Sequence, residues 1–352
     1  MEPYFRFLFF ILLCCFFDNI TKTGTKFFKV LVFVGLTLFA GFRSNVGIDY
    51  ASYVLIFNGV EGHSLAEPGM ALLMKFISKI GGTEHLYFLI MASITEFFVY
   101  KILVKEKQYF WLLVLMYYCI SIFYFASFNG VRNFTSIAII IWSLRFVESG
   151  EFKKFALVVV VTGFIFHYSA LTFLPLYFYL RSHQSILSIL IISLAVFVGG
   201  SVLFDFLEYT PYAKYELLMG NNDIRENSVE LIHYLFAVLA LLLILVGNRF
   251  KNLKNDSVLY NINTLSFYTI LMVIHQSAGS FVMLLQRFNN YFLFSYLLIV
   301  PALLSSMGKG NKAIMKTVLV LFSFAYFIRT IVIKGEHHML VPYDFDLTLF
   351  VR

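Results

Sequence analysis

Long apolar runs separated by short polar links follow one another along the whole chain. Most approach the ~20 apolar residues that a helix needs to cross a bilayer, and a few are shorter. Read as helices, they predict spans at 4–17, 27–42, 86–104, 110–126, 131–147, 155–166, 169–180, 184–204, 230–247, 258–275, 288–305 and 313–333. The pattern predicts an all-α polytopic membrane protein, with residues 1–352 forming one domain of about twelve transmembrane helices.

One segment has a different pattern. Residues 67–80 are amphipathic and carry Lys75 and Lys79 among apolar positions. An apolar face with a charged flank is typical of a helix lying in the membrane interface. We predict a re-entrant or interfacial helix here instead of a span.

Composition excludes a soluble protein. Apolar residues make up 60% of the chain and charged residues 13%, against about 45–50% and about 25% in soluble proteins, and the mean hydropathy is +0.82. The net charge is +7, but the basic residues form short groups between spans instead of one basic face, so no nucleic-acid partner is expected. Cys14, Cys15 and Cys119 lie in predicted spans and have neither disulfide nor metal-ligand spacing.

Charge bias predicts the topology. The links near 18–29, 101–107, 145–154, 181–184, 248–256 and 306–316 hold most of the lysines and arginines and few acids. By the positive-inside rule this side is cytoplasmic, so both termini and the loops 43–66 and 205–229 face outward. This topology requires the run 155–180 to break near His167; a single long tilted helix is the alternative.

Several polar residues then gather on the outer side. An ionisable residue at membrane depth usually faces an interior cavity and is a functional candidate. Three arginines on one side suggest an anionic ligand, because the guanidinium fork matches phosphate oxygens; the alternative is that each contacts lipid headgroups or a loop acid. The candidates are Arg43, Asn45, Asp49, Tyr50, Glu67, Asn129, Arg132, His167, Arg287 and Tyr343.

Two of these residues could carry a proton. His167 is one, because histidine side chains ordinarily titrate near neutral pH, but a histidine at a helix end often only makes hydrogen bonds. Asp49 could act as a general base or pair with Arg43, six residues before it.

The tail offers a weak metal motif. Asp344 and Asp346 match the Asp-x-Asp pattern of soluble glycosyltransferases, but two acids at this spacing are common, and the tail faces away from cytoplasmic nucleotide sugars. Walker-type loops, His-Glu-x-x-His and Gly-x-Ser-x-Gly are absent from the sequence, which argues against enzymes of those types. No metal or cofactor is expected.

Several short motifs follow one another in a fixed order between about residues 30 and 345. They are Gly-Phe-Arg-Ser-Asn-Val-Gly-Ile-Asp-Tyr-Ala-Ser-Tyr at 41–53, Glu-Pro-Gly-Met-Ala-Leu-Leu at 67–73, Phe-Asn-Gly-Val-Arg-Asn at 128–133, Lys-Phe at 154–155, Phe-His-Tyr-Ser-Ala-Leu at 166–171, Arg-Phe-Asn-Asn-Tyr-Phe at 287–292 and Pro-Tyr at 342–343. In this order they resemble the EpsG-like family of Wzy-type polysaccharide polymerases. Asn133 departs from the resemblance, because a glutamine is expected there.

The resemblance implies a metal-independent glycosyltransferase of GT-C-like architecture in the bacterial inner membrane. Such an O-antigen polymerase transfers a growing glycan from undecaprenyl diphosphate onto the next lipid-linked repeat unit at the periplasmic face. Its partners are the lipid-linked donor and acceptor, membrane lipids and, as a candidate, a separate chain-length regulator.

Chemistry then divides the candidates by role. Arg132 and Arg287 would stabilise the diphosphate leaving group, with Arg43 as a third cation, and Asp49 or His167 would act as base. Asn45, Tyr50, Glu67, Asn129 and Tyr343 would bind substrate.

Two other functions remain open. A flippase or other transporter of lipid-linked oligosaccharides would also be a many-span protein with a cationic cavity, although its charged groups should be reachable from both leaflets. A membrane O-acyltransferase would use a histidine base, but nearer the cytoplasmic acyl donor.

Overall fold

The computed structural model describes residues 1–21, 26–60, 67–207, 231–246, 257–275 and 282–350. The chain divides into two compact units. Unit 1 comprises Met1–Leu174 and Gly308–Arg352, and unit 2 comprises Pro175–Met307. Both units are built from helices, and the described strands are short.

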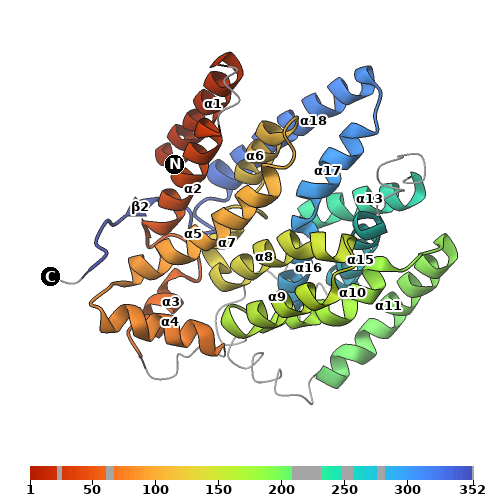
Figure 1. The fold of residues 1–352 in the computed structure, drawn as a ribbon, viewed down its shortest axis with the longest axis horizontal. Helices are drawn as coiled ribbons and strands as arrows, with labels where there is room; N and C mark the ends of the chain where they lie inside the picture. Colours follow the sequence, from red (N-terminus) through yellow and green to blue (C-terminus); the bar gives the residue numbers. More distant parts are fainter. Residues whose placement is uncertain (22–25, 61–66, 208–230, 247–256, 276–281, 351–352) are drawn as a thin grey trace. The chain divides into compact units, whose positions relative to one another are not determined.

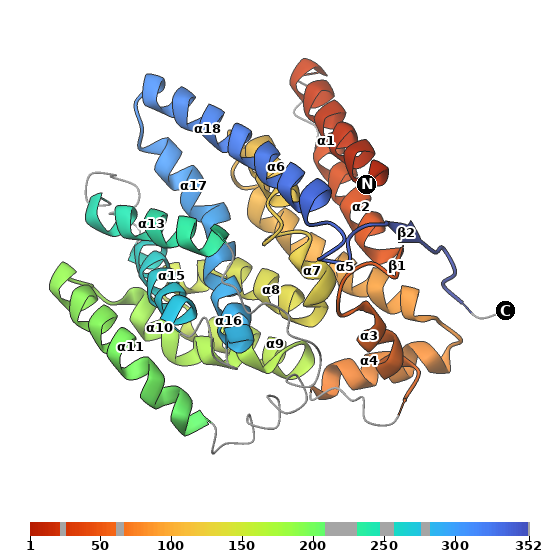
Figure 2. The same cartoon turned by 180° about the vertical axis from the view of Figure 1, so that it is seen from behind.

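Unit 1 is a series of packed helices. In sequence they are α1 (Glu2–Thr21), α2 (Phe27–Gly41), α3 (Tyr50–Phe57), α4 (Pro68–Lys79), α5 (Glu84–Leu103), α6 (Phe110–Cys119), α7 (Ala126–Asn129), α8 (Val131–Glu148), α9 (Phe152–Ile165), the 3₁₀ turn η1 (Tyr168–Thr172), the start of α10 (Phe173–Arg181), α18 (Lys309–Ile328) and the π-helical turn η3 (Arg329–Ile333). Helix α1 contacts α2, and α2, α5, α8 and α9 then pack in succession (Figures 1 and 2).

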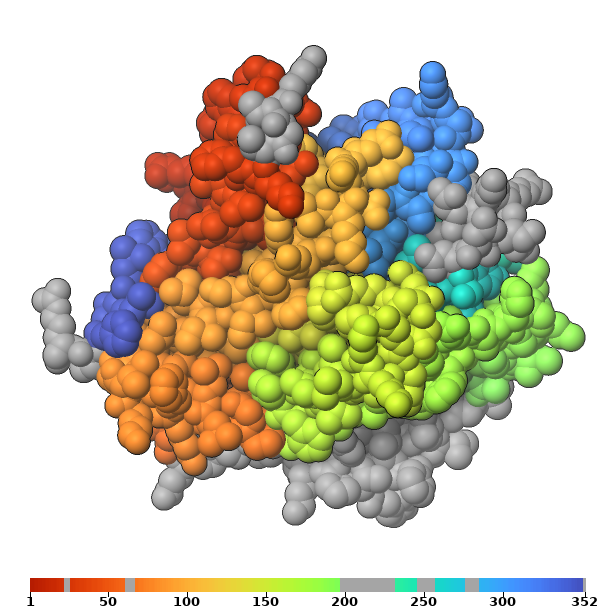
Figure 3. Space-filling model, viewed as in Figure 1, coloured from red at the N-terminus to blue at the C-terminus, as the bar shows by residue number. Residues whose placement is uncertain are grey.

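The C-terminal tail returns to the start of unit 1. Strand β2 (Asp344–Phe345) pairs antiparallel with β1 (Arg43–Ser44). Farther along the tail, Thr83 N donates to the Leu349 carbonyl at 2.9 Å. In Figure 3 the tail (blue) accordingly lies against the red and orange segments. The tail therefore fixes the loop that follows α2.

Unit 2 centres on one polar helix. Its elements are most of α10, then α11 (Ile186–Leu207), α13 (Leu231–Val246), α15 (Ser257–His275), α16 (Val282–Phe294) and α17 (Tyr296–Ser305). Helix α15 contacts α11, α13 and α16, so its hydroxyl and amide side chains are buried between apolar neighbours.

The membrane assignment is confirmed in its coarse form. Among the described residues, five helices are long and apolar enough to cross a bilayer: Glu2–Thr21, Glu84–Leu103, Ser257–His275, Leu285–Ser305 and Lys309–Ile333. The chain is a multi-pass helical membrane protein. Most of the predicted outer loop 205–229 lies outside the described residues.

Two detailed predictions are confirmed. The run 155–180 breaks between α9, which ends at Ile165, and α10, which begins at Phe173. The amphipathic segment forms a helix, α4, whose exposed side chains include Leu72 and Phe76. Its re-entrant or interfacial position stays a prediction.

The predicted span 110–126 is wrong in its second half. Helix α6 ends at Cys119, and a turn precedes α7. In that turn Tyr124 donates from its backbone N–H to the Tyr117 carbonyl, and its hydroxyl donates to the Leu36 carbonyl at 2.7 Å. Because the turn is buried and aromatic, hydropathy alone could not distinguish it from helix.

Candidate functional site

The site centres on an ion pair between Glu67 and Arg132. Oε2 of Glu67 accepts a hydrogen bond from Nη1 of Arg132, and its Oε1 faces the backbone N–H of Tyr168 at 3.4 Å. Glu67 is only 3% exposed, and the side chain of Arg132 is 16% exposed. The pair therefore joins three distant segments in a largely buried setting, where charges interact more strongly than in water.

The sequence Glu-Pro-Gly explains how Glu67 reaches this position. Pro68 occupies the first turn of α4, where its fixed φ suits a helix start. A Cβ on Gly69 would lie 2.5 Å from the Ile165 Cα. Glycine thus lets the start of α4 approach the end of α9, which brings Glu67 to the turn after that helix.

Arg132 lies in the first turn of α8, which follows α7 after Gly130. Its guanidinium carbon is 5.9 Å from the centre of the Tyr53 ring. Within the described part of the chain, its buried Nε has no hydrogen-bond partner. Arg132 therefore keeps a donor, Nε, beyond its hydrogen bonds to Glu67 and Tyr53.

His167 occupies the break between α9 and η1. Its Nδ1 is 2.6 Å from the Ser169 hydroxyl oxygen and accepts from the Ser169 backbone N–H at 3.3 Å. The imidazole thereby caps η1. Because Tyr168 is the next residue, the same turn carries both His167 and the N–H that faces Glu67.

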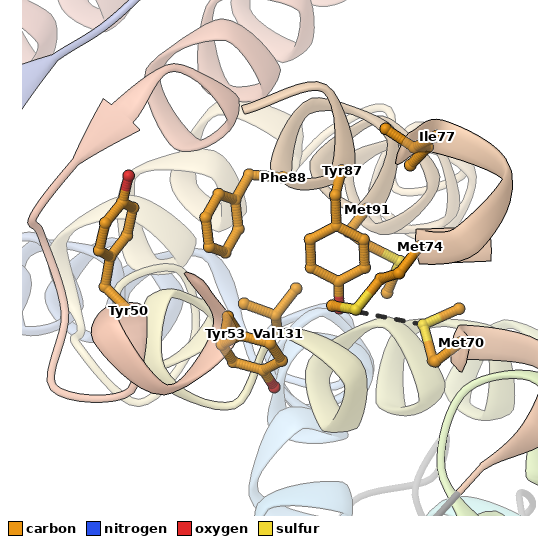
Figure 4. Packing of buried hydrophobic residues seen from close by; sticks show 9 residues of the cluster. All are labelled: Tyr50, Tyr53, Met70, Met74, Ile77, Tyr87, Phe88, Met91 and Val131. Atoms are coloured by element: carbon orange, nitrogen blue, oxygen red, sulfur yellow. Dashed lines mark hydrogen bonds between the residues drawn. The ribbon is translucent and has the colours of Figure 1, made fainter. Parts of the chain in front are cut away.

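A cluster of buried aromatic and methionine side chains supports the pair (Figure 4). The Tyr87 hydroxyl reaches the Met70 sulfur at 3.9 Å. The cluster consists of Tyr50, Tyr53, Met70, Met74, Ile77, Tyr87, Phe88, Met91 and Val131, contributed by α3, α4, α5 and α8. It fixes the starts of α3, α4 and α8 against α5, and those starts carry the site residues.

Arg43 is placed differently from Arg132. It is 2% exposed, and its donors reach three backbone carbonyls: Nη1 binds Ala40, Nε binds Val46 at 3.3 Å and Nη2 binds Phe128 at 3.1 Å. Burial lowers the pKa of Arg43, but a guanidinium remains charged in proteins. In this geometry Arg43 ties the end of α2 to α7.

Asn129 also holds the loop that follows β1. Its side-chain oxygen accepts from the Ile48 N–H at 2.7 Å. Gly47 has φ +101°, and a Cβ there would lie 2.9 Å from the Asn129 side-chain oxygen, so glycine is required for this contact. Asn45, with φ 53°, is exposed in the same loop.

The two candidate tyrosines pack against other rings. Tyr50 stacks on Phe88 with centroids 5.1 Å apart, and Tyr343 stacks on Phe39 at 4.3 Å. The Tyr343 hydroxyl also donates to the Phe39 carbonyl at 2.6 Å. Burial raises the pKa of both hydroxyls, so both remain neutral hydrogen-bonding groups.

Unit 1 thus brings together most of the predicted residues, in two neighbouring groups. The first group lies around the loop after α2 and consists of Arg43, Tyr50, Asn129 and Tyr343. Asp49 precedes α3 in that loop and is partly buried. Glu67, Arg132 and His167 form the second group. Arg287, in α16, belongs to unit 2.

The acidic tail residues hydrogen-bond locally. Asp344 accepts from the Phe345 N–H at 2.8 Å, and Asp346 accepts from the Thr348 N–H at 2.7 Å. The bonds from Thr348 lower the pKa of Asp346, which also lies 3.5 Å from Nε2 of His85.

Two residues near the site were not predicted from the sequence. Tyr53 lies next to Arg132 and hydrogen-bonds its guanidinium. Glu96 is buried in α5, accepts from the Tyr117 hydroxyl at 2.7 Å and lines a small cavity together with Arg43 and Thr95. A single carboxylate in an apolar run was the available signal for Glu96.

Comparisons with known proteins identify the family. No curated protein and no solved structure matches the chain. The model of the EpsG family matches residues 26–345, which includes every site residue described above. The chain therefore belongs to the EpsG family, whose members are polysaccharide polymerase-like or glycosyltransferase-like membrane proteins.

Proposed function

We propose that this protein is a polysaccharide polymerase that transfers a growing glycan from undecaprenyl diphosphate onto the next lipid-linked repeat unit. The observation that carries the proposal is the Glu67–Arg132 pair, in which a mostly buried arginine retains an unused donor. Membership of the EpsG family supports the reaction class.

Release of the diphosphate is the electrostatic problem of this reaction. The C1–O bond of the donor sugar breaks, and negative charge develops on the departing oxygen. A preorganised cation in a partly buried site stabilises that charge more than water does. Arg132 is suited to this role because its planar donors match phosphate oxygens.

We propose different roles for the other two arginines. Arg43 already binds three carbonyls, so we assign it to holding the loop that bears Asp49 and Tyr50. Arg287 remains a proposed second contact to the diphosphate, as the motif at 287–292 suggests. Asn45, Asn129 and Tyr343 are proposed to line the sugar path.

The architecture, the location and the orientation in the membrane are part of the same proposal. We infer a GT-C-like architecture with about twelve spans, located in a bacterial inner membrane with the site facing the periplasm. The positive-inside distribution of lysine and arginine supports this orientation. The positive charge at the leaving group comes from arginine, and no metal is part of the proposed reaction.

Deletion of the gene tests the function. A polymerase mutant should still attach single repeat units to its acceptor while long chains disappear, and the wild-type gene should restore them. Gel separation of the surface glycan by length distinguishes these states. Unchanged chain length would contradict the proposal.

The same experiment separates the rival functions. Complete loss of surface glycan, with lipid-linked units retained on the cytoplasmic side, would indicate a flippase. Normal chain length with loss of an acyl substituent would indicate an O-acyltransferase.

A further inference from the structure

We propose that Glu67 is the catalytic base that accepts the proton of the attacking sugar hydroxyl. This inference rests on the proposed function and goes beyond it, because the sequence pattern indicated Asp49 or His167 as the base and Glu67 only as a binding residue. Three features of the Glu67 carboxylate support it: its accepting capacity, its position on the Arg132 guanidinium and its burial.

The carboxylate has unused accepting capacity. One oxygen accepts from Arg132, and the other faces the Tyr168 N–H at the long distance of 3.4 Å. An ionised carboxylate offers about four lone-pair positions. Glu67 can therefore accept a hydroxyl proton without losing its contact with Arg132.

The geometry of the guanidinium allows the base and the diphosphate to bind together. Glu67 occupies Nη1 of Arg132. The Nε–Nη2 edge is the other fork of the group, and Nε is buried without a partner in the described residues. That edge can take two phosphate oxygens, so the anion need not displace Glu67.

The shared arginine also orients the reaction. With the diphosphate on one edge and Glu67 at the opposite nitrogen, Arg132 fixes the leaving group relative to the base. Such positioning of reacting groups is a large part of catalysis. The Tyr168 N–H lies on the other side of the carboxylate, 3.4 Å from Oε1.

The proposed step balances. The acceptor hydroxyl oxygen attacks C1 of the donor sugar and forms the new glycosidic bond. The C1–O bond to the diphosphate breaks, and its electron pair leaves with undecaprenyl diphosphate. The hydroxyl proton passes to Glu67, which later releases it to water.

His167 is less suited to be the base in this structure. Its Nδ1 is engaged by Ser169 through the hydroxyl and the backbone N–H, an arrangement that caps η1. We assign His167 to holding the turn whose next residue, Tyr168, contacts Glu67.

The variant Glu67→Gln tests the base directly. The amide oxygen can still accept from Arg132 while the negative charge is lost. With lipid-linked repeat units extracted from cells lacking the gene, we expect polymerisation to fall at least ~100-fold, the usual effect of losing a general base. Binding of undecaprenyl diphosphate should stay equal or tighten, because a neighbouring like charge is removed.

Glu84→Gln is the matched control. Glu84 opens α5 and is more exposed than Glu67, with 26% of its side chain accessible. Glu84→Gln should leave both polymerisation and binding of undecaprenyl diphosphate near wild type. Polymerisation by Glu67→Gln within about threefold of wild type would overturn the proposal, as would weakened diphosphate binding together with a lower melting temperature.

A second variant tests the role of Glu67 if Glu67→Gln does not fold. Glu67→Ala leaves space for a small carboxylate, and added formate should restore part of its polymerisation. Absence of restoration, in protein that still binds undecaprenyl diphosphate, would overturn the role of Glu67. If wild-type protein itself forms no polymer from the extracted units, the proposed function fails instead.

Discussion

The buried polar groups of the two units differ in kind. Unit 1 buries ionisable side chains: Arg43, Glu67 and Glu96 are each at most 3% exposed. The buried polar side chains among the described residues of unit 2 are amides and hydroxyls, with one histidine, His233. There, Thr269 donates to the Asn289 side-chain oxygen at 2.6 Å, and Tyr296 donates to that of Asn263 at 2.9 Å.

The difference indicates different tasks. Neutral hydrogen bonds between membrane helices contribute modestly and hold helices together. Charged side chains at membrane depth cost much more and are retained where a ligand or reaction needs them. We therefore propose that the reaction takes place in unit 1 and that the buried hydrogen bonds of α15 hold the helices of unit 2 together, with Arg287 as the proposed exception.

Replacing Arg132 by lysine should have the largest effect. Lysine keeps the charge but loses the planar fork, so we expect at least ~100-fold less long-chain polymer with normal protein abundance. Gel analysis of glycan length and immunoblotting of membranes measure the two quantities.

Arg145→Lys is the control for this prediction, because Arg145 lies near the other end of α8 and stacks 3.7 Å from the centre of the Trp142 ring. It should retain polymerisation. Near-normal chain length in Arg132→Lys would remove the diphosphate contact from the proposal.

The same substitution at Arg287 tests the exception in unit 2. Arg287→Lys should also shorten the polymer if Arg287 takes part in the reaction, because lysine lacks the planar fork of arginine. Comparing the two chain-length distributions at equal abundance measures this. Wild-type chain length would leave unit 2 with scaffold residues only.

Gly69→Ala should damage the site through packing. The new Cβ would lie 2.5 Å from the Ile165 Cα, which is backbone and cannot rotate away. We expect a loss of about 1–3 kcal/mol of stability, together with reduced polymerisation because Glu67 shifts. Thermal unfolding in detergent measures the first effect.

Gly310→Ala provides the comparison. Gly310 lies in α18, and a Cβ there meets no atom within 4 Å. Alanine should be neutral or slightly stabilising at such a position. Equal melting temperatures for the two alanine variants would show that the approach of α4 to α9 is not tight.

Sequence patterns predicted the helices better than the site. The apolar runs predicted the bounds of α5 and α8 to within two residues. The polar break at His167 separates α9 from α10, as expected. Helix α3 was not predicted, because it is short and lies inside an expected loop.

The arrangement within the site could not be read from spacing. Glu67 and Arg132 are 65 residues apart, and only the approach of α4 to α9 brings Glu67 to the turn near Arg132. From the sequence, Arg43 and Arg132 were equivalent candidates for binding an anion. In the structure, the Arg43 donors are occupied by the carbonyls of Ala40, Val46 and Phe128. Backbone partners of this kind leave no pattern in a sequence.

Thr269→Val should have a small effect. It removes the hydroxyl that donates to Asn289 and keeps the side-chain shape. A loss of about 0.6 kcal/mol is expected for such a bond between membrane helices, with polymerisation retained. Thr317→Val, which removes only a bond within an exposed turn of α18, should change the melting temperature less. Loss of polymerisation in Thr269→Val at normal stability would show that the neutral network takes part in the reaction.

Chelation of metal ions should have no effect. In the proposed reaction the positive charge at the leaving group comes from arginine, and Asp344 and Asp346 already accept hydrogen bonds from their own tail. Polymerisation of extracted lipid-linked units should therefore continue in excess EDTA, and the double variant Asp344→Asn/Asp346→Asn should behave like wild type in the same assay. Abolition by EDTA with restoration by Mn²⁺ would contradict this, and failure of the double variant would identify the tail as the metal site. In that case, Arg132 and a bound cation would together supply the positive charge at the leaving group.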